Sequence, residues 1–222
     1  MIKIRNIEKT YTKGSLSTHV LRGINLAIDR GEYVAIMGTS GTGKSTLMNI
    51  LGCLDKPTSG HVELDGIDVL KLDDDTLSAL RNKKFGFVFQ QFFLLERTTA
   101  QDNVLLPLIY ADKYPADAVE RAKGALSRVG LEDRTEYLAN ELSGGQQQRV
   151  AIARALINDP DVILADEPTG NLDSENTRDV LEIFSRLHKE RRTIVVVTHD
   201  REVAEKAQRI LELKDGKIYE NP

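Results

Sequence analysis

The segment at residues 38–45, Gly-Thr-Ser-Gly-Thr-Gly-Lys-Ser, constrains the fold more than any other part of the sequence. It fits the pattern G-x-x-x-x-G-K-[ST], in which a glycine-rich loop joins a buried strand to the first turn of a helix. The apolar run Tyr33–Met37 stands directly before it, as a buried strand would. Apolar residues at the helical spacing i, i+3, i+4, i+7 follow it, namely Leu47, Ile50, Leu51 and Leu54. The sequence therefore predicts a strand, a phosphate-binding loop and a helix.

Two further apolar runs, Val162–Ala165 and Thr193–Thr198, have the same character as Tyr33–Met37. Continuous apolar runs are typical of parallel strands that are buried on both faces, whereas alternating runs indicate strands with one exposed face. A second helical repeat lies between these two runs, with apolar residues at Val180, Ile183, Phe184 and Leu187. This alternation of strands and helices predicts an α/β fold with a mostly parallel sheet.

Other segments predict two additions to this core. Short alternating strands at Ile2–Ile4, Ile24–Ile28 and Val62–Leu64 predict an antiparallel sheet beside the parallel one. Residues 91–157 are mostly helical in pattern, with Glu, Lys and Arg at the polar positions, and predict an inserted helical lobe. At 222 residues, we expect a single domain, residues 1–222, whose core comprises residues 1–90 and 158–222.

Composition excludes several classes of function. The formal net charge is −4, whereas nucleic-acid binders are usually basic, so no nucleic-acid partner is expected. The apolar runs are far shorter than the roughly 20 residues that a membrane-spanning helix needs, and Met1–Ile4 leads directly into charged sequence, unlike a signal peptide. The single cysteine, Cys53, cannot form an internal disulfide, which suits a reducing cytosol. We interpret Cys53 as a small buried thiol, because no histidine lies near it in the sequence.

The glycine-rich loop has a defined physical use. The N–H groups of such a loop and of the helix that follows it point into a concavity and bind phosphate. Gly38, Gly41 and Gly43 would let the backbone approach the phosphate closely. Lys44 would reach the β- and γ-phosphate oxygens, and the Ser45 hydroxyl would ligate Mg²⁺. The alternative is a glycine-rich turn with a purely structural role.

Polar side chains also follow the other two apolar runs. Because ligands of open parallel sheets bind at the carboxyl ends of the strands, these side chains should meet the loop in one crevice. An unpartnered Asp166 at the end of a buried strand would be costly, and Mg²⁺ would relieve that cost. Glu167 would act as general base on the attacking water, and His199 would donate to the γ-phosphate. The alternatives are an ordinary acidic pair at a strand end and a structural histidine.

The pentapeptide Leu142-Ser-Gly-Gly-Gln146 opens another predicted helix. Ser143, with Gly144 and Gly145, would cap that helix, and its N-terminus would form a second anion site. One chain does not readily bring two such N-termini to the same phosphate. Two chains packed head to tail do, so the pentapeptide predicts a homodimer that shares its nucleotides.

The glycine-rich loop at residues 38–45, the pentapeptide at residues 142–146 and the sequence around them resemble the nucleotide-binding subunits of ABC transporters. The resemblance covers essentially all 222 residues. It implies a P-loop NTPase with a RecA-like, mostly parallel sheet, an N-terminal antiparallel β subdomain and an inserted α-helical lobe. It also implies ATP and Mg²⁺ as cofactors, and ATP hydrolysis as the activity. By the same resemblance, Tyr11 stacks on the adenine, and Gln90 is the hinge glutamine of the lobe, with its neighbour Gln91 as the alternative. Asn171–Asp173 would contact the partner's site.

The predicted site residues fall into three groups. The catalytic residues are Glu167, His199, Gln90 and Lys44. The nucleotide contacts are Tyr11, Gly38, Thr39, Ser40, Gly41, Thr42, Gly43, Lys44, Ser45, Thr46, Ser143, Gly145 and Gln146, the last three acting on the nucleotide of the other subunit. The Mg²⁺ ligands are Ser45, Gln90 and Asp166. ATP would close the dimer, and hydrolysis would release it.

Three longer strings, at residues 51–60, 85–91 and 164–173, are similar to the MacB and LolD branch of the family. This similarity implies export of macrolides, toxins or peptides, or release of lipoproteins. It implies integral membrane permease subunits as partners, a periplasmic or extracellular adaptor protein, and a peripheral position at the cytoplasmic face of the inner membrane. Thr39 departs from the branch, which usually has Pro there, but that position contributes mainly its backbone. A free subunit and an excised ATPase domain both remain open.

Two other classes of protein compete with this interpretation. A soluble ABC ATPase acting on ribosomes or DNA usually has two cassettes, a long coiled-coil insertion or a basic surface, and none of these is present in the sequence. A P-loop kinase or GTPase would have no use for the pentapeptide at residues 142–146.

Overall fold

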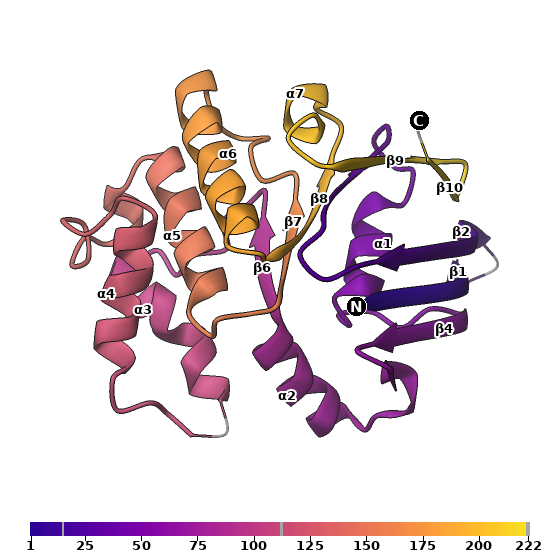
Figure 1. Ribbon diagram of the computed structural model, residues 1–222, viewed down its shortest axis with the longest axis horizontal. Helices are drawn as coiled ribbons and strands as arrows, with labels where there is room; N and C mark the ends of the chain where they lie inside the picture. The colour runs from indigo at the N-terminus through magenta and orange to yellow at the C-terminus, as the bar shows by residue number, and fades with distance from the viewer. Residues whose placement is uncertain (15, 112, 221–222) are drawn as a thin grey trace.

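The computed structural model describes residues 1–14, 16–111 and 113–220. Pro222, the last residue of the predicted single domain, lies outside the described residues. A six-stranded sheet with the order β10-β9-β3-β8-β7-β6 forms the centre of the molecule (Figure 1). All its neighbouring pairs are parallel except β10 with β9. Its strands are β3 (Tyr33–Met37), β6 (Phe85–Phe89), β7 (Val162–Asp166), β8 (Thr193–Thr198), β9 (Arg209–Lys214) and β10 (Lys217–Glu220). The predicted α/β fold with a mostly parallel sheet is confirmed.

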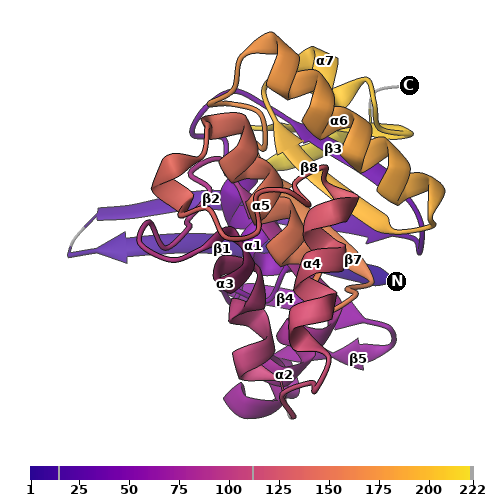
Figure 2. The same ribbon diagram turned by 90° about the vertical axis from the view of Figure 1, so that its left-hand side faces the viewer.

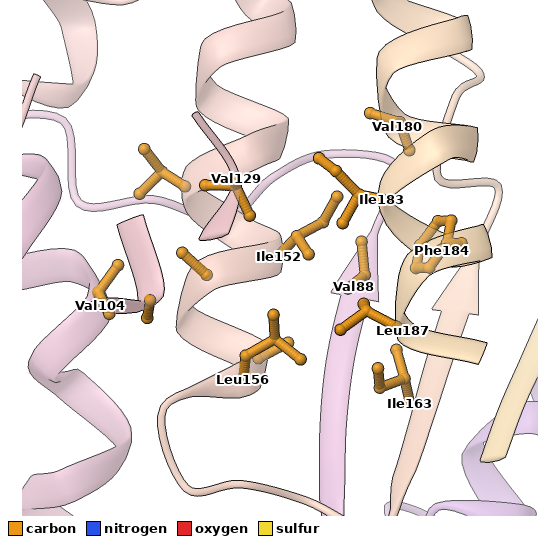
Figure 3. Packing of buried hydrophobic residues seen from close by; sticks show 14 of the residues in the cluster. Val88, Val104, Val129, Ile152, Leu156, Ile163, Val180, Ile183, Phe184 and Leu187 are labelled. Atoms are coloured by element: carbon orange, nitrogen blue, oxygen red, sulfur yellow. The ribbon is translucent and has the colours of Figure 1, made fainter. Parts of the chain in front are cut away.

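The parallel strands are buried on both faces, which explains their continuous apolar runs. Along β7, Ile163 packs into one hydrophobic cluster, and its neighbours Val162 and Leu164 pack into a second cluster on the other face. Figure 3 shows the first cluster, in which Ile163 lies near side chains of α6 (Ser174–Lys189). The second cluster joins the sheet to α1 (Lys44–Leu51) and to the antiparallel sheet.

The antiparallel sheet has the order β2-β1-β4-β5 and contains the predicted short strands. Its strands are β1 (Ile2–Lys13), β2 (Leu16–Ile28), β4 (Ser59–Leu64) and β5 (Ile67–Asp68). In β1, Ile2 and Ile4 are buried and alternate with exposed residues, as the sequence pattern indicated. Figure 2 shows β1 and β2 projecting together as a long hairpin.

A group of helices lies at the end of the molecule opposite the antiparallel sheet (Figure 1). It consists of α3 (Ala100–Leu105), η2 (Leu106–Tyr110), α4 (Ala118–Arg128), η3 (Ala139–Glu141) and α5 (Gly144–Leu156). Helix α5 also packs against the edge strand β6, where a Cβ on Gly86 would stand 2.3 Å from the Ala155 carbonyl oxygen. Glycine at position 86 therefore permits the close approach of α5 to the sheet. Among the helices of the described residues, none combines the length and apolar composition that crossing a membrane requires.

Two local features differ from the sequence prediction. Helix α1 ends at Leu51, so Leu54 lies beyond it and is 45% exposed, although the apolar repeat extended the helix to that residue. Gly52 caps the helix and Cys53 adopts a positive φ of 56°, which turns the chain away. The sequence analysis also missed helix α2 (Asp74–Lys84), in which Leu77 is the buried residue, and the short η1 (Val69–Lys71) before it.

Candidate nucleotide and catalytic site

A pocket of about 760 Å³ lies at the carboxyl ends of β3, β7 and β8. Its lining brings together the phosphate-binding loop and the polar residues that end the other two strands. The predicted crevice at this edge of the sheet is therefore confirmed. The lining residues are Val20, Thr39, Ser40, Gly41, Gly43, Lys44, Ser45, Thr46, Gln90, Asp166, Glu167 and His199.

The loop wraps around the Lys44 side chain. Lys44 is buried, and its Nζ donates to the carbonyl oxygens of Gly38 at 2.8 Å and Thr39 at 3.1 Å. Gly43 has φ of 100°, and a Cβ there would lie 2.7 Å from the Val20 side chain, so both its conformation and its surroundings require glycine. Predicted contacts Gly38 and Thr42 lie within the loop and are not part of the pocket lining. The ammonium group is thus held at the centre of the loop.

Asp166 ends β7, and the Ser45 side chain lies close to its carboxyl. Burial raises the pKa of the Asp166 carboxyl, and the Glu167 charge adds to this, whereas Ser45 and the Lys44 charge act in the opposite direction. The Oδ1 atom of Asp166 is buried and has no hydrogen-bond partner among the described residues. Mg²⁺ binds oxygen ligands, and the unpartnered carboxylate oxygen of Asp166 and the nearby Ser45 hydroxyl are two such ligands. These residues therefore fit a magnesium ion.

Glu167 follows Asp166 and is fixed from several directions. Its Oε1 lies 2.8 Å from Nδ1 of His199 and 3.8 Å from Nζ of Lys44. Its Oε2 accepts hydrogen bonds from the Thr198 hydroxyl at 3.1 Å and the His199 backbone N–H at 3.3 Å. Glu167 also has a positive φ of 45°, a conformation that costs energy and is common at functional sites. The carboxylate is therefore held in the pocket by its neighbours.

Gln90 follows β6 and lines the pocket, whereas Gln91 does not contribute to the lining. The side-chain amide of Gln90 donates to Oδ1 of Asn171 at 3.1 Å, and the Asn171 amide donates back to the Gln90 carbonyl oxygen at 3.0 Å. The geometry favours Gln90 over Gln91 as the residue that faces a nucleotide. Sequence reasoning did not foresee this pairing with Asn171, because the two residues are 81 positions apart.

The pentapeptide lies away from the pocket of its own chain. Ser143 caps α5 by accepting from the Gln146 backbone N–H at 3.3 Å, and the Gln146 side chain accepts from the Ser143 N–H at 2.9 Å. A Cβ on Gly145 would stand 1.7 Å from Oδ1 of Asn176 on α6, so Gly145 also has a packing role. The sequence prediction that a helix begins at this string is confirmed.

Tyr11, the predicted adenine-stacking residue, is not part of the pocket lining. It lies on β1 and is 45% exposed, and its hydroxyl donates to Oδ2 of Asp55 at 2.9 Å. Val20 of β2, which sequence reasoning missed, lines the pocket. Only the strand register and the packing of β2 against Gly43 reveal this position, since Val20 has no motif of its own.

Comparison with known proteins agrees with this geometry. The family model described as ABC transporter matches residues 21–170. The chain is 55% identical to the macrolide export ATP-binding/permease protein MacB of Campylobacter fetus, covering 98% of this chain and 34% of MacB. It is 53% identical to the ABC transporter ATP-binding protein YvrO of Bacillus subtilis, covering 98% of this chain and 95% of YvrO. The chain thus spans about a third of the MacB protein and nearly all of YvrO.

A solved structure is similar over the whole chain. It is the dimeric, post-hydrolysis state of the ATP-binding cassette MJ0796, bound to ADP and Pi. The TM-score is 0.90 at 47% sequence identity, and the match covers 99% of this chain and 98% of that chain. The predicted nucleotide-hydrolase fold, with its two sheets and helical region, is therefore confirmed by a close relative.

Proposed function

Because the chain belongs to the ABC transporter family and is an ATP-hydrolysing cassette, we propose that two copies close head to tail on two ATP molecules and drive a membrane permease. The observation that carries this proposal is that Ser143 and α5 lie outside the pocket that Lys44 of the same chain lines. A second copy supplies the missing helix N-terminus to each site. The relative MJ0796 was solved as a dimer, which supports the arrangement.

Within each site, the side chains divide the work of phosphoryl transfer to water. Lys44 and the loop N–H groups bind the phosphates. Glu167 accepts the proton of the attacking water, and His199 holds the Glu167 carboxylate and donates to the γ-phosphate. Ser45 and Asp166, with Gln90 beside them, would hold Mg²⁺, which would neutralise charge on the phosphates. Ser143, Gly145 and Gln146 of the other copy complete the cradle, and closure excludes water.

We place the contact with the permease on the helical region, taken as residues 91–157 between core segments 1–90 and 158–222. Several large apolar side chains are exposed there, and exposed apolar surface is typical of a protein-binding site. Tyr110, for example, is 76% exposed. The others are Phe93, Leu95, Ile109, Tyr114, Val119 and Tyr137. Binding of an integral permease to these side chains would hold the chain at the cytoplasmic face of the membrane.

In this proposal the permease selects the cargo. Relatives such as MacB are named for macrolide export, and export or lipoprotein release of the MacB or LolD kind is the role that we propose here. An adaptor protein on the other side of the membrane is part of the same proposal. Cargo choice then depends on the permease, while this chain supplies closure and hydrolysis.

Mixed dimers test the head-to-tail arrangement. Lys44→Ala removes the phosphate contact, and Ser143→Arg blocks the anion site at the N-terminus of α5, so each variant alone should be inactive. In an equimolar mixture about half of the dimers carry both variants and have one intact site, so about a quarter of the wild-type ATPase rate should return. If each α5 served the pocket of its own chain, every site in the mixture would carry one of the changes. No rate would then return, and the head-to-tail model would be wrong.

Membrane recruitment tests the partner. The chain should sediment with membranes when an integral permease of the MacB or LolD type is co-expressed, and remain in the supernatant when expressed alone. Ile109→Ser with Tyr110→Ser should abolish sedimentation while leaving the ATPase rate of the purified chain unchanged. Sedimentation that persists in this double variant would argue against Ile109 and Tyr110 as part of the docking surface.

A further inference from the structure

Gln148 on α5 is completely buried and contacts two separate segments of the nucleotide pocket. Its Nε2 donates to the carbonyl oxygen of Phe89 at 3.3 Å and to that of Pro168 at 2.5 Å. Phe89 immediately precedes Gln90, and Pro168 immediately follows Glu167. One side chain therefore joins the segment that carries the hinge glutamine to the segment that carries the proposed base.

The register of the sheet explains why one amide reaches both carbonyls. Phe89 at the end of β6 pairs with Asp166 at the end of β7, and the chain leaves both strands at this level. Beyond this point no ladder hydrogen bond joins the two strands, so Gln90 and Glu167 depend on other contacts for their relative position. Gln148 supplies such a contact where the two segments diverge.

The hydrogen-bond inventory of Gln148 is unusual for a purely structural residue. Both hydrogens of its amide are used, while its Oε1 is buried without a partner among the described residues. Burying such an oxygen is unfavourable, and an apolar side chain of equal length would avoid that cost. It would, however, leave the two carbonyl oxygens without this donor. The two donated hydrogen bonds therefore hold the two segments together in spite of the cost of burying Oε1.

A second residue of α5 supports the same segment farther along. Arg154 is half-buried, and its guanidinium donates to the carbonyl oxygens of Phe92 at 2.7 Å and Phe93 at 2.5 Å. Phe93 has a positive φ of 49°, so this stretch of backbone needs support from outside. Gln90 and Gln91 thus lie between two attachment points on a single helix. The same helix begins at Ser143, the proposed contact with the other subunit.

We propose that Gln148 is a positioning residue for ATP hydrolysis, which fixes Gln90 relative to Glu167 and ties both to α5. Its amide holds the Phe89 and Pro168 carbonyls on the helix that Ser143 caps. Gln148 does not touch the nucleotide in this role; it acts through Gln90 and Glu167. The inference rests on the proposed roles of those two residues.

Gln148→Met tests this role, because methionine keeps the length of the side chain and removes its donor. The full chain is used, with kcat expressed per folded molecule. We expect kcat to fall at least about tenfold and KM for ATP to change less than about threefold, since Lys44 and its loop are untouched. Gln101→Met is the matched control, because Gln101 also has a buried Oε1 without a partner among the described residues but lies on another helix, α3. Its kcat should stay near that of the parent.

A double-mutant cycle separates positioning from a general effect on the fold. On a Gln90→Ala background, Gln148→Met should lower the residual kcat less than about threefold, because the group that it positions is already absent. An undiminished effect on that background, or a kcat within about twofold of the parent for Gln148→Met alone, would overturn the proposal. If Gln148→Met does not fold, Gln148→Asn replaces it, since a shorter amide withdraws the donor and should lower kcat in the same way.

The single variants Gln90→Ala and Glu167→Gln show which inference fails. If both keep full activity, the proposed roles of the site are wrong. If both lose activity and Gln148→Met does not, only the positioning role of Gln148 is wrong.

Discussion

Nδ1 of His199 lies 2.8 Å from Oε1 of Glu167, and the His199 backbone N–H donates to the other oxygen of the same carboxylate. The histidine therefore holds Glu167 by both its ring and its backbone. Because the chain turns out of β7 at Glu167 with a positive φ, this support compensates for a strained backbone. The pair defines the part of the pocket where an attacking water would be oriented.

Replacing Glu167 with Gln keeps the size of the side chain and removes the proposed general base. We expect the ATPase rate to fall by on the order of 100-fold, the usual contribution of a positioned general base. ATP binding should persist, so ATP-bound dimers should accumulate and be visible by sedimentation velocity. Glu202→Gln, at an exposed position, is the control and should retain the parental rate. A Glu167→Gln variant that hydrolyses ATP at nearly the parental rate would remove Glu167 from its proposed role.

The unpartnered Oδ1 of Asp166 leads to a prediction about metal dependence. Chelation with EDTA should abolish ATP hydrolysis. Asp166→Asn should raise the Mg²⁺ concentration for half-maximal activity at least about tenfold, because a carboxylate is a stronger Mg²⁺ ligand than an amide. A Mg²⁺ titration of the ATPase rate at fixed ATP measures this, with exposed Asp133→Asn as the control. Equal titration curves for parent and Asp166→Asn would contradict the assignment.

Substitution by alanine should have different effects on stability at two neighbouring glycines at the start of α5. A Cβ on Gly145 would collide with the Asn176 side chain, whereas a Cβ on Gly144 would have Phe92 at 3.9 Å as its nearest neighbour. Gly145→Ala should therefore lower the free energy of unfolding by about 1–3 kcal/mol, and Gly144→Ala should change it little. Chemical denaturation measures both. Asn176→Gly added to Gly145→Ala should recover part of the lost free energy of unfolding; no recovery would mean that the collision is not the cause.

An ion-pair group joins the antiparallel sheet to the core and predicts a pH dependence of stability. Asp65 lies 2.9 Å from Arg30 and 3.2 Å from Lys84, and both cations also pair with Asp161. Partial burial raises the pKa of the Asp65 carboxyl, but the hydrogen bond from Lys84 and the two positive charges outweigh it and hold the pKa below its ordinary value. The contribution of Asp65 to stability is thus present above the ordinary Asp pKa and is lost as pH falls through the folded-state pKa.

Asp65→Asn should accordingly lower the free energy of unfolding at pH 7 by about 1 kcal/mol, which corresponds to about 2–4 °C in Tm. The difference between variant and parent should shrink as the pH approaches 3. Thermal melts across this range measure it, with exposed Glu182→Gln as the control. A difference that stays constant with pH would show that the charge of Asp65 is not what stabilises this contact.

Much of the fold could be predicted because burial on both faces leaves a strong signal. The runs that became β3, β7 and β8 are apolar throughout, and their predicted bounds agree with the structure to within one residue. Helix α2 gave only a weak signal, since Leu77 is buried and Leu80 partly buried, and two leucines one turn apart show no sustained periodicity. Helix α1 was predicted too long because Leu54 continues the repeat after Gly52 and Cys53 have turned the chain.

Some residues of the site could likewise be predicted from the sequence, and others could not. Lys44, Asp166 and His199 meet in one pocket as predicted, because Asp166 ends one recognisable strand, His199 follows another, and the loop before Lys44 follows the third. The positions of Val20 and Gln148 could not be predicted, since they depend on how distant segments pack. The roles assigned to Tyr11 and to the residues of the pocket remain predictions that the variants above can test.

The hydrogen bonds that hold Lys44 to the carbonyl oxygens of Gly38 and Thr39 have an entropic consequence. A free lysine side chain loses about 1.5–2 kcal/mol of rotamer entropy when it is immobilised. Here that loss occurs when the chain folds, before any phosphate arrives. The incoming phosphate therefore meets an ammonium group that is already oriented, and more of its interaction energy remains available as binding affinity.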